Sequence, residues 1–161
     1  MAKYFAKLSS KIDNILLRDG STTLQGYKVE DIKLANDSDT PESVKAFHNN
    51  DAEYEEYFEG ENNNPKGKSA FIGGYYILSL NKFTNVNTFP SWKLDSTDLI
   101  YGPSEPWPLI DSSMTENDQY IVIWDEDNLR LTRARLNEDL SVVEPKQIQV
   151  YNTSTTTWEN L

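Results

Sequence analysis

The chain has 161 residues, with 15 Lys and Arg against 26 Asp and Glu, so its formal net charge is −11 at pH 7. It contains one histidine, His48, and no cysteine, which excludes disulfides, thiolate metal sites and a cysteine nucleophile. The acidic balance excludes nucleic acid as a partner, because nucleic-acid binding normally requires a positive surface.

Composition predicts a β-rich globular protein. Hydrophobic residues make up 37% of the chain, and 4 Trp, 9 Tyr and 6 Phe supply much of the surface that a core must bury. We expect an α+β fold, mostly antiparallel β, with hairpins in a small sandwich or barrel-like arrangement and one helical segment near residues 40–59. The expected division is a single mainly-β domain over residues 1–128, with the helix as an insertion, and a C-terminal strand pair or arm over 129–161. No apolar run approaches the ~20 residues that span a membrane, so no membrane association is expected.

The first third of the chain predicts strands. Residues 3–8 and 12–17 have the composition of two short strands, with a turn at residues 9–11. A second turn is predicted at residues 19–21, where Asp, Gly and Ser follow one another. Loose alternation of apolar residues over 24–34 favours another strand.

A helix is predicted next. Thr40 is a suitable N-cap, and Pro41 suits the first helical position. An apolar stripe then recurs every three or four residues, with Asp51 as its one polar member, and the polar run at 49–51 leaves open whether one helix or two form here. His48 lies beside this stripe and is interpreted as a surface residue. The stripe consists of Val44, Phe47, Asp51, Tyr54 and Phe58.

The second half predicts antiparallel hairpins. Residues 70–78 have the composition of a strand with a bend at its glycines. Three later segments, over residues 92–101, 121–132 and 149–158, each have a strand, a short polar turn and a return strand. The candidate core residues are Phe71, Trp92, Leu94, Ile123 and Trp124.

No catalytic residue, metal ligand or cofactor site stands out. The acidic run at residues 125–127 lacks the spacing of a calcium loop and is better interpreted as a hairpin turn. No pair of carboxylates is singled out as a glycosidase would require. Arg130, Arg133 and Arg135 alternate along a predicted strand, where they suit an acidic partner or form a solvated face.

The order of short motifs along residues 4–127 resembles a family of small, poorly characterised structural and accessory proteins of tailed bacteriophages that infect marine bacteria and cyanobacteria. The closest motif is Pro-Ser-Trp-Lys-Leu, which begins at Pro90. The chain departs from the family at residues 9–11, where an Asp-Glu-Asn turn is usual, and in its tail over 129–161. The resemblance implies a phage origin and no catalytic residues. The matching segments are residues 4–8 with 14–15, 66–76, 89–95, 106–108, and 120 with 124–127.

These observations predict a non-enzymatic virion protein, made in the host cytoplasm and present in many copies. Within that class we favour a capsid-surface decoration or cement protein that docks on the major capsid protein. A tail, baseplate or fibre-associated protein is the alternative, and a glycan-acting enzyme or a host-factor-binding accessory protein belongs to a different class. Aromatic and arginine side chains are favoured anchors at interfaces. The candidate contact residues are Tyr4, Phe5, Trp107, Arg130, Arg133, Arg135, Tyr151 and Trp158.

Overall fold

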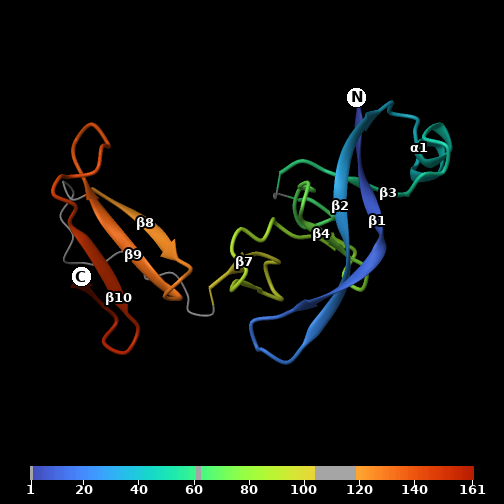
Figure 1. Cartoon of the computed structure of the whole chain (residues 1–161). Coiled ribbons are helices and arrows are strands. Elements are labelled where there is room, and N and C mark those ends of the chain that lie inside the picture. Colours follow the sequence, from blue (N-terminus) through green and yellow to red (C-terminus); the bar gives the residue numbers. More distant parts are fainter. Residues whose placement is uncertain (1, 61–62, 104–118) are drawn as a thin grey trace. The chain divides into compact units, whose positions relative to one another are not determined.

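The computed structural model describes residues 2–60, 63–103 and 119–161 (Figure 1). The chain divides into two compact units, one of residues 1–88 and 92–104 and the other of residues 89–91 and 105–161. Strands form 46% of the structure, and the described part contains one short helix. The prediction of a mostly antiparallel β fold with a helical segment is therefore confirmed. None of the described residues forms a helix long and apolar enough to cross a membrane.

The first unit is a curled five-stranded sheet with a helix and a small second sheet. The five strands follow the order β3-β1-β2-β4-β5, all neighbours are antiparallel, and the sheet curls into a half-barrel. The two short strands β6 and β7 pair separately and confirm the first predicted hairpin. The elements are β1 (Lys3–Leu16), β2 (Thr23–Ala35), α1 (Pro41–Phe47), β3 (Glu53–Tyr57), β4 (Tyr75–Ile77), β5 (Lys82–Phe83), β6 (Lys93–Leu94) and β7 (Tyr101–Gly102).

Strand β1 is continuous, so the predicted turn at residues 9–11 is wrong. The register passes from Leu8 opposite Val29 to Ile12 opposite Tyr27, which leaves an irregularity inside the strand. Both flanks of this irregularity pair with the same strand, β2. The extra residues therefore bulge from the ladder instead of reversing the chain.

The carboxylate of Asp19 holds the turn between β1 and β2, at the predicted position. Its Oδ1 accepts hydrogen bonds from the backbone N–H groups of Ser21 (2.9 Å) and Thr22 (2.8 Å), and its Oδ2 accepts one from the Thr22 hydroxyl. The Thr22 hydroxyl and then these backbone donors lower the pKa of Asp19 to about 2. The ionised carboxylate is therefore the form that stabilises the turn.

We expect Asp19→Ala to lower the melting temperature of the first unit at neutral pH, and Asp19→Asn, which keeps an acceptor oxygen, to lower it less. The contribution of the charge is present above the ordinary pKa of 3.8 and is lost as the pH falls through about 2. The difference between the wild type and Asp19→Asn should shrink between about pH 5 and pH 2. Thermal melts followed by circular dichroism measure it, and a constant difference would contradict this role of Asp19.

Helix α1 begins where it is predicted but ends after seven residues. Thr40 and Ser43 form a reciprocal capping box at its N-terminus. Beyond the helix, Asn49 and Asn50 adopt left-handed backbone angles, with φ of 58° and 55°, a conformation that Asn tolerates better than most residues. The chain turns there, and the predicted continuation of the helix to residue 59 is wrong, because this segment pairs with β1 as strand β3.

The core of the first unit lies on both faces of its sheet. One cluster packs Phe5 of β1 against Val44 of α1 and Tyr54 of β3. A second contains Leu94, fully buried as predicted, with Trp92 half-buried against it. The largest cluster, centred on the fully buried Phe83, consists of Ala6, Leu8, Val29, Tyr57, Ala70, Tyr76 and Phe83.

Phe71 does not belong to the core, which corrects its predicted place there. Its side chain is 47% exposed. Strand β4 begins only at Tyr75, and the preceding segment turns at Gly73, which has a φ of 90°. Because a Cβ on Gly74 would lie 2.8 Å from the carbonyl oxygen of Thr84, this segment runs too close to the backbone of its neighbour for a larger residue.

The second unit contains one four-stranded antiparallel sheet with the order β11-β10-β9-β8. It confirms the predicted hairpins over residues 121–132 and 149–158. The observed division of the chain differs from a boundary at residue 128, because that boundary separates β8 from β9, which pair along their whole lengths. The strands are β8 (Gln119–Asp125), β9 (Arg130–Leu136), β10 (Ile148–Asn152) and β11 (Thr157–Asn160).

The two candidate core residues of the second unit differ in burial. Trp124 is half-buried, and its indole N–H donates to a carboxylate oxygen of Glu126 at 2.7 Å. Ile123 is 49% exposed, so its predicted burial is wrong. By strand alternation, Ile123 lies on the opposite face of the sheet from Trp124.

Candidate functional site

The predicted contact residues fall into both units, and several are internal. Phe5 is fully buried beneath α1 and cannot contact a partner in this structure, which corrects its assignment. Tyr4 is half-buried, with its ring centroid 5.5 Å from that of Tyr57. Trp107 lies outside the described residues.

The three arginines of β9 have different environments. Arg130 pairs with Asp125 in its own hairpin at 3.0 Å, and Arg135 is exposed. Arg133 is only 6% exposed, and its guanidinium lies over the rings of Tyr120 (4.1 Å) and Trp158 (4.5 Å). The predicted role of Arg133 as a partner contact is therefore corrected to an internal packing role.

The remaining predicted contacts, Tyr151 and Trp158, face each other across the β10–β11 hairpin. Their ring centroids are 5.3 Å apart, and both residues are half-buried. The structure thus brings Arg133, Tyr151 and Trp158 together on one face of the second sheet. This arrangement serves the packing of that face.

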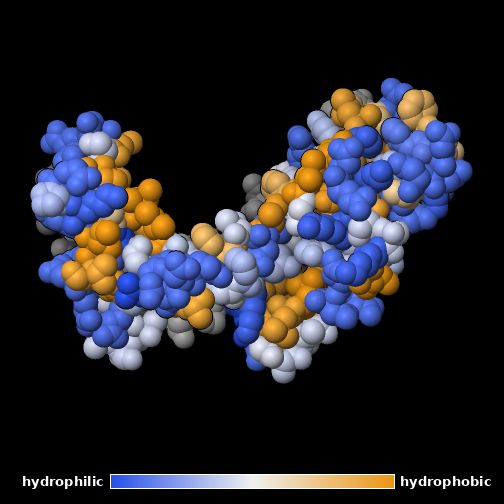
Figure 2. All heavy atoms as spheres, in the orientation of Figure 1, coloured by the Kyte–Doolittle hydropathy of each residue, from blue (hydrophilic) through white to orange (hydrophobic). Residues whose placement is uncertain are grey.

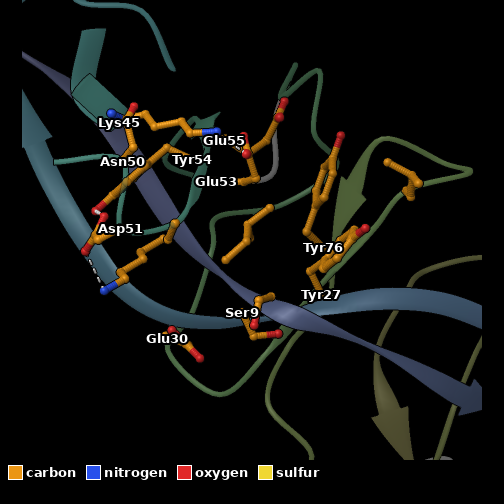
Figure 3. Close-up of a pocket in the computed structure, with 15 residues that line it drawn as sticks. Ser9, Tyr27, Glu30, Lys45, Asn50, Asp51, Glu53, Tyr54, Glu55 and Tyr76 are labelled. Carbon is orange, nitrogen blue, oxygen red and sulfur yellow. Dashed lines mark hydrogen bonds and ion pairs between the residues drawn. The ribbon is translucent and has the colours of Figure 1, made fainter. Parts of the chain in front are cut away.

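A pocket of about 580 Å³ lies in the first unit, beside the bulge of β1 (Figure 3). One wall is made by Tyr27 and Tyr76, which stand directly opposite each other in the β2–β4 register. Figure 3 shows Lys45, Asp51 and Tyr54 on the other side of the pocket. Sequence reasoning missed this site, because its two tyrosines are far apart in the chain and only the strand register joins them.

Ion pairs dominate the electrostatics of this pocket. Lys7 lies 2.8 Å from Asp51, and the Tyr54 hydroxyl donates to the same carboxylate at 3.0 Å. The hydrogen bond from Lys7 is the main cause that lowers the pKa of Asp51, and burial, followed by the bond to Asp51, raises the pKa of Tyr54 to about 12. Glu53 and Glu55 are paired with Lys45 and Lys66 in the same way. The pocket thus offers the half-buried ring of Tyr27 and carboxylates that are already paired with lysines.

A smaller cleft of about 280 Å³ separates the end of β2 from α1. Two large apolar side chains, Leu34 and Phe47, line it and are 67% and 82% exposed. The buried Val44 forms part of its floor. We name this feature the Leu34–Phe47 notch. Phe47 belongs to the predicted apolar stripe of the helix, but its ring lies in solvent.

No metal centre is visible in the described ranges, where no group of three or more His, Cys, Asp or Glu side chains is arranged to hold an ion. In the acidic run at the β8–β9 turn, Asp125 accepts from Asn128 and pairs with Arg130, as the predicted hairpin turn requires. Glu126 instead accepts from a residue far along the chain, Ser91, at 2.7 and 2.9 Å.

Comparisons of the chain with protein-family models, with curated proteins and with solved structures gave no match.

Proposed function

We propose that this chain is a non-enzymatic structural protein of a tailed bacteriophage particle, and that it decorates the capsid surface by docking on the major capsid protein. The phage origin rests on the motif order along residues 4–127. The docking role is carried by one structural observation, the Leu34–Phe47 notch. The finer proposal of a capsid location follows from the expectation that such small β-rich proteins stabilise a shell by surface complementarity.

The notch has the chemistry of a protein-docking site. Removing apolar surface from water gains about 25 cal/mol of free energy per Å² buried. Aromatic side chains are also enriched at protein interfaces. Phe47 and Leu34 flank a concave surface that suits an apolar side chain from a partner. Thr40 and Ser43 fix the start of α1, so the short helix presents Phe47 from a defined position.

The carboxyl groups favour binding over acid–base catalysis. A glycosidase needs one carboxyl group with a raised pKa to act as a proton donor. Where a shift is resolved among the described Asp and Glu residues, the pKa is lowered, in each case chiefly by hydrogen bonds, as at Asp51, Asp125 and Glu126. These groups are therefore held ionised.

Quantitative mass spectrometry of purified virions tests the proposal. A decoration protein should be present in numbers comparable with the capsid subunits and should be released separately from the tail. Absence from virions would overturn the structural role altogether. A copy number matching a tail ring or fibre would move the protein to the alternative location.

We expect Phe47→Asp to weaken binding to particles that lack the protein by about tenfold or more, because the change places a charge at the centre of the notch. The fold should be retained, since the ring is 82% exposed. Co-sedimentation of purified protein with such particles measures the binding. Leu140→Asp is the matched control, because Leu140 is 67% exposed but lies in the second unit. Equal binding by both variants would show that the notch is not the docking site.

A tail or fibre location is the second candidate, and the pocket beside β1 favours it. Aromatic rings pack against the apolar faces of sugars. The half-buried Tyr27 offers such a ring at the pocket wall, and the neighbouring polar side chains suit hydroxyl groups. Binding of host surface polysaccharide by the purified protein, together with a low copy number, would support this location over the capsid.

A further inference from the structure

The end of β2 is an open sheet edge beside the Leu34–Phe47 notch. Strand β4 pairs with residues 26–28 of β2. The last backbone bonds on that side join Val29 to Gly73 and Gly74. Beyond Val29, β1 is the only strand that pairs with β2 among the described residues. On the viewed face, hydrophobic residues lie among hydrophilic ones where the end of β2 leads into α1 (Figure 2).

The strand register shows which backbone groups face this edge. Val29 directs its N–H and C=O away from β1, so its opposite residue, Leu8, directs its own groups to β3. The pairing of β1 with β3 is regular from Tyr4 to Leu8, and the direction alternates, so Tyr4 also faces β3. Leu34 stands opposite Tyr4 and therefore directs its N–H and C=O to the outer edge.

Leu34 supplies the free backbone groups of this edge. In the described ranges its N–H and C=O have no hydrogen-bond partner, and the residue is 67% exposed. The N–H of Ile32, by contrast, is already bonded to the carboxylate of Asp31 at 2.8 Å. A lysine usually discourages pairing at a sheet edge, but the ammonium group of Lys33 lies 2.7 Å from the same carboxylate, which compensates its charge.

The notch lies where a side chain of an added strand would point. Phe5 and Ala35 pack with Val44, so α1 covers the sheet face that carries these side chains. A strand added to β2 would lie about 4.8 Å from it, and every second side chain would point to the same face. There it would meet Val44 in the floor of the notch and the exposed ring of Phe47.

The charge of the notch favours a basic partner segment. The carboxylate of Asp39 accepts from two neutral donors, the backbone N–H of Asn36 at 2.8 Å and the hydroxyl of Ser43 at 2.9 Å. The nearby ammonium group of Lys3 donates to the backbone carbonyl of Asp39 and pairs with Glu56. Within the described part of the chain, no cation is paired with the carboxylate of Asp39.

We propose that the partner binds the notch as an extended segment, which adds to the outer edge of β2 as a sixth strand. It places an apolar side chain in the notch and a Lys or Arg beside Asp39. The inference rests on the proposed docking role of the notch and adds the form and the chemistry of the partner segment. Backbone bonds to Leu34 then supply affinity, and the notch selects the side chain. A second copy is disfavoured as the occupant, because each copy has a net charge of −11.

Leu34→Pro tests the added strand, with Leu34→Ala as the matched control. Both variants lose the leucine side chain, but only proline removes the outward N–H, and edge strands tolerate proline at such positions. In co-sedimentation with particles that lack the protein, Leu34→Pro should bind at least about tenfold more weakly than Leu34→Ala. Equal binding by the two variants would overturn the proposal.

Lys33→Pro establishes the direction of the backbone groups. The N–H of Lys33 faces β1 by alternation, so this variant should melt at a much lower temperature than Leu34→Pro. Thermal melts followed by circular dichroism compare the two. If Leu34→Pro melts as low as Lys33→Pro, the N–H of Leu34 belongs to the ladder with β1 and the edge is not open.

Asp39→Asn tests the charge of the partner segment. The variant keeps an acceptor oxygen for Ser43 and should bind the particles several-fold more weakly, with a smaller dependence on salt concentration. Unchanged binding and salt dependence would show that no basic side chain lies beside Asp39.

The failure of the added strand and the failure of the proposed function can be told apart. Absence of the protein from virions would overturn the proposed function and this partner with it. Incorporation into virions with equal binding by the two Leu34 variants would overturn the added strand alone. Sedimentation velocity over a concentration series supplies the last check. A dimer that Leu34→Pro abolishes and Leu34→Ala retains would assign the edge to a second copy, contrary to the proposal.

Discussion

Phe5→Ala is expected to lower the free energy of unfolding of the first unit by about 3–5 kcal/mol, the usual cost of deleting a buried phenyl ring. The side chain of Phe5 has no exposed surface and packs against Val44 and Tyr54. It therefore joins β1, α1 and β3, and alanine would leave a cavity that three elements line. Urea denaturation measures the total loss, and hydrogen exchange of β1 and β3 amides assigns it to this unit.

Phe47→Ala is the matched control for this change. It removes the same phenyl ring a short distance away in the first unit, but Phe47 is 82% exposed. We expect a change within about 0.5 kcal/mol, as for other surface substitutions. Similar losses of unfolding free energy for both variants would contradict the burial of Phe5. Phe5 would then again be a candidate partner contact, as predicted from the sequence.

The elements that the sequence predicts correctly have local signals. Asp19 and Asp125 sit in turns where their carboxylates accept from nearby backbone or side-chain donors, so the chain reversal is encoded within a few residues. Thr40 with Pro41 marks the helix start in the same way. These signals require no knowledge of distant contacts.

The elements predicted wrongly depend on partners far along the chain. Residues 53–57 have apolar positions that fit a helix, yet β1 recruits them as strand β3, with Tyr54 and Tyr57 buried on opposite faces. Residues 9–11 resemble a turn, but β2 pairs on both sides of them and keeps β1 continuous. Tertiary pairing overrides the local preference in both segments.

The candidate sites were harder to predict than the fold. The notch exists because Phe47 is the last residue of a helix that is shorter than its apolar stripe. The pocket depends on Tyr27 and Tyr76 meeting across β2 and β4. For Arg133 the sequence predicted a surface site that the fold does not provide. Its alternation with Arg130 and Arg135 suggests a charged surface, but aromatic rings cover its guanidinium in the folded sheet.

Arg133 organises one face of the second sheet. Its guanidinium contacts the rings of Tyr120 and Trp158, and its Nε–H donates to the side-chain oxygen of Gln149 at 2.8 Å. These residues belong to β8, β11 and β10. One side chain of β9 therefore contacts each of the other three strands of the sheet. The long aliphatic stem is buried with it, which adds packing to the charge interactions.

Arg133→Ala is therefore expected to destabilise the second unit by about 2–4 kcal/mol, through loss of two cation–π contacts and a charge-assisted hydrogen bond. Arg133→Lys keeps the charge but loses the planar group that stacks, so it should recover only part of the loss. Arg135→Ala is the control, two residues along the same strand and exposed, where about 0.5 kcal/mol or less is expected. Urea denaturation with hydrogen exchange of β9 and β10 amides measures all three variants. Equal losses at both arginines would place Arg133 on the surface. Full rescue by lysine would show that charge alone, and not stacking, holds this face together.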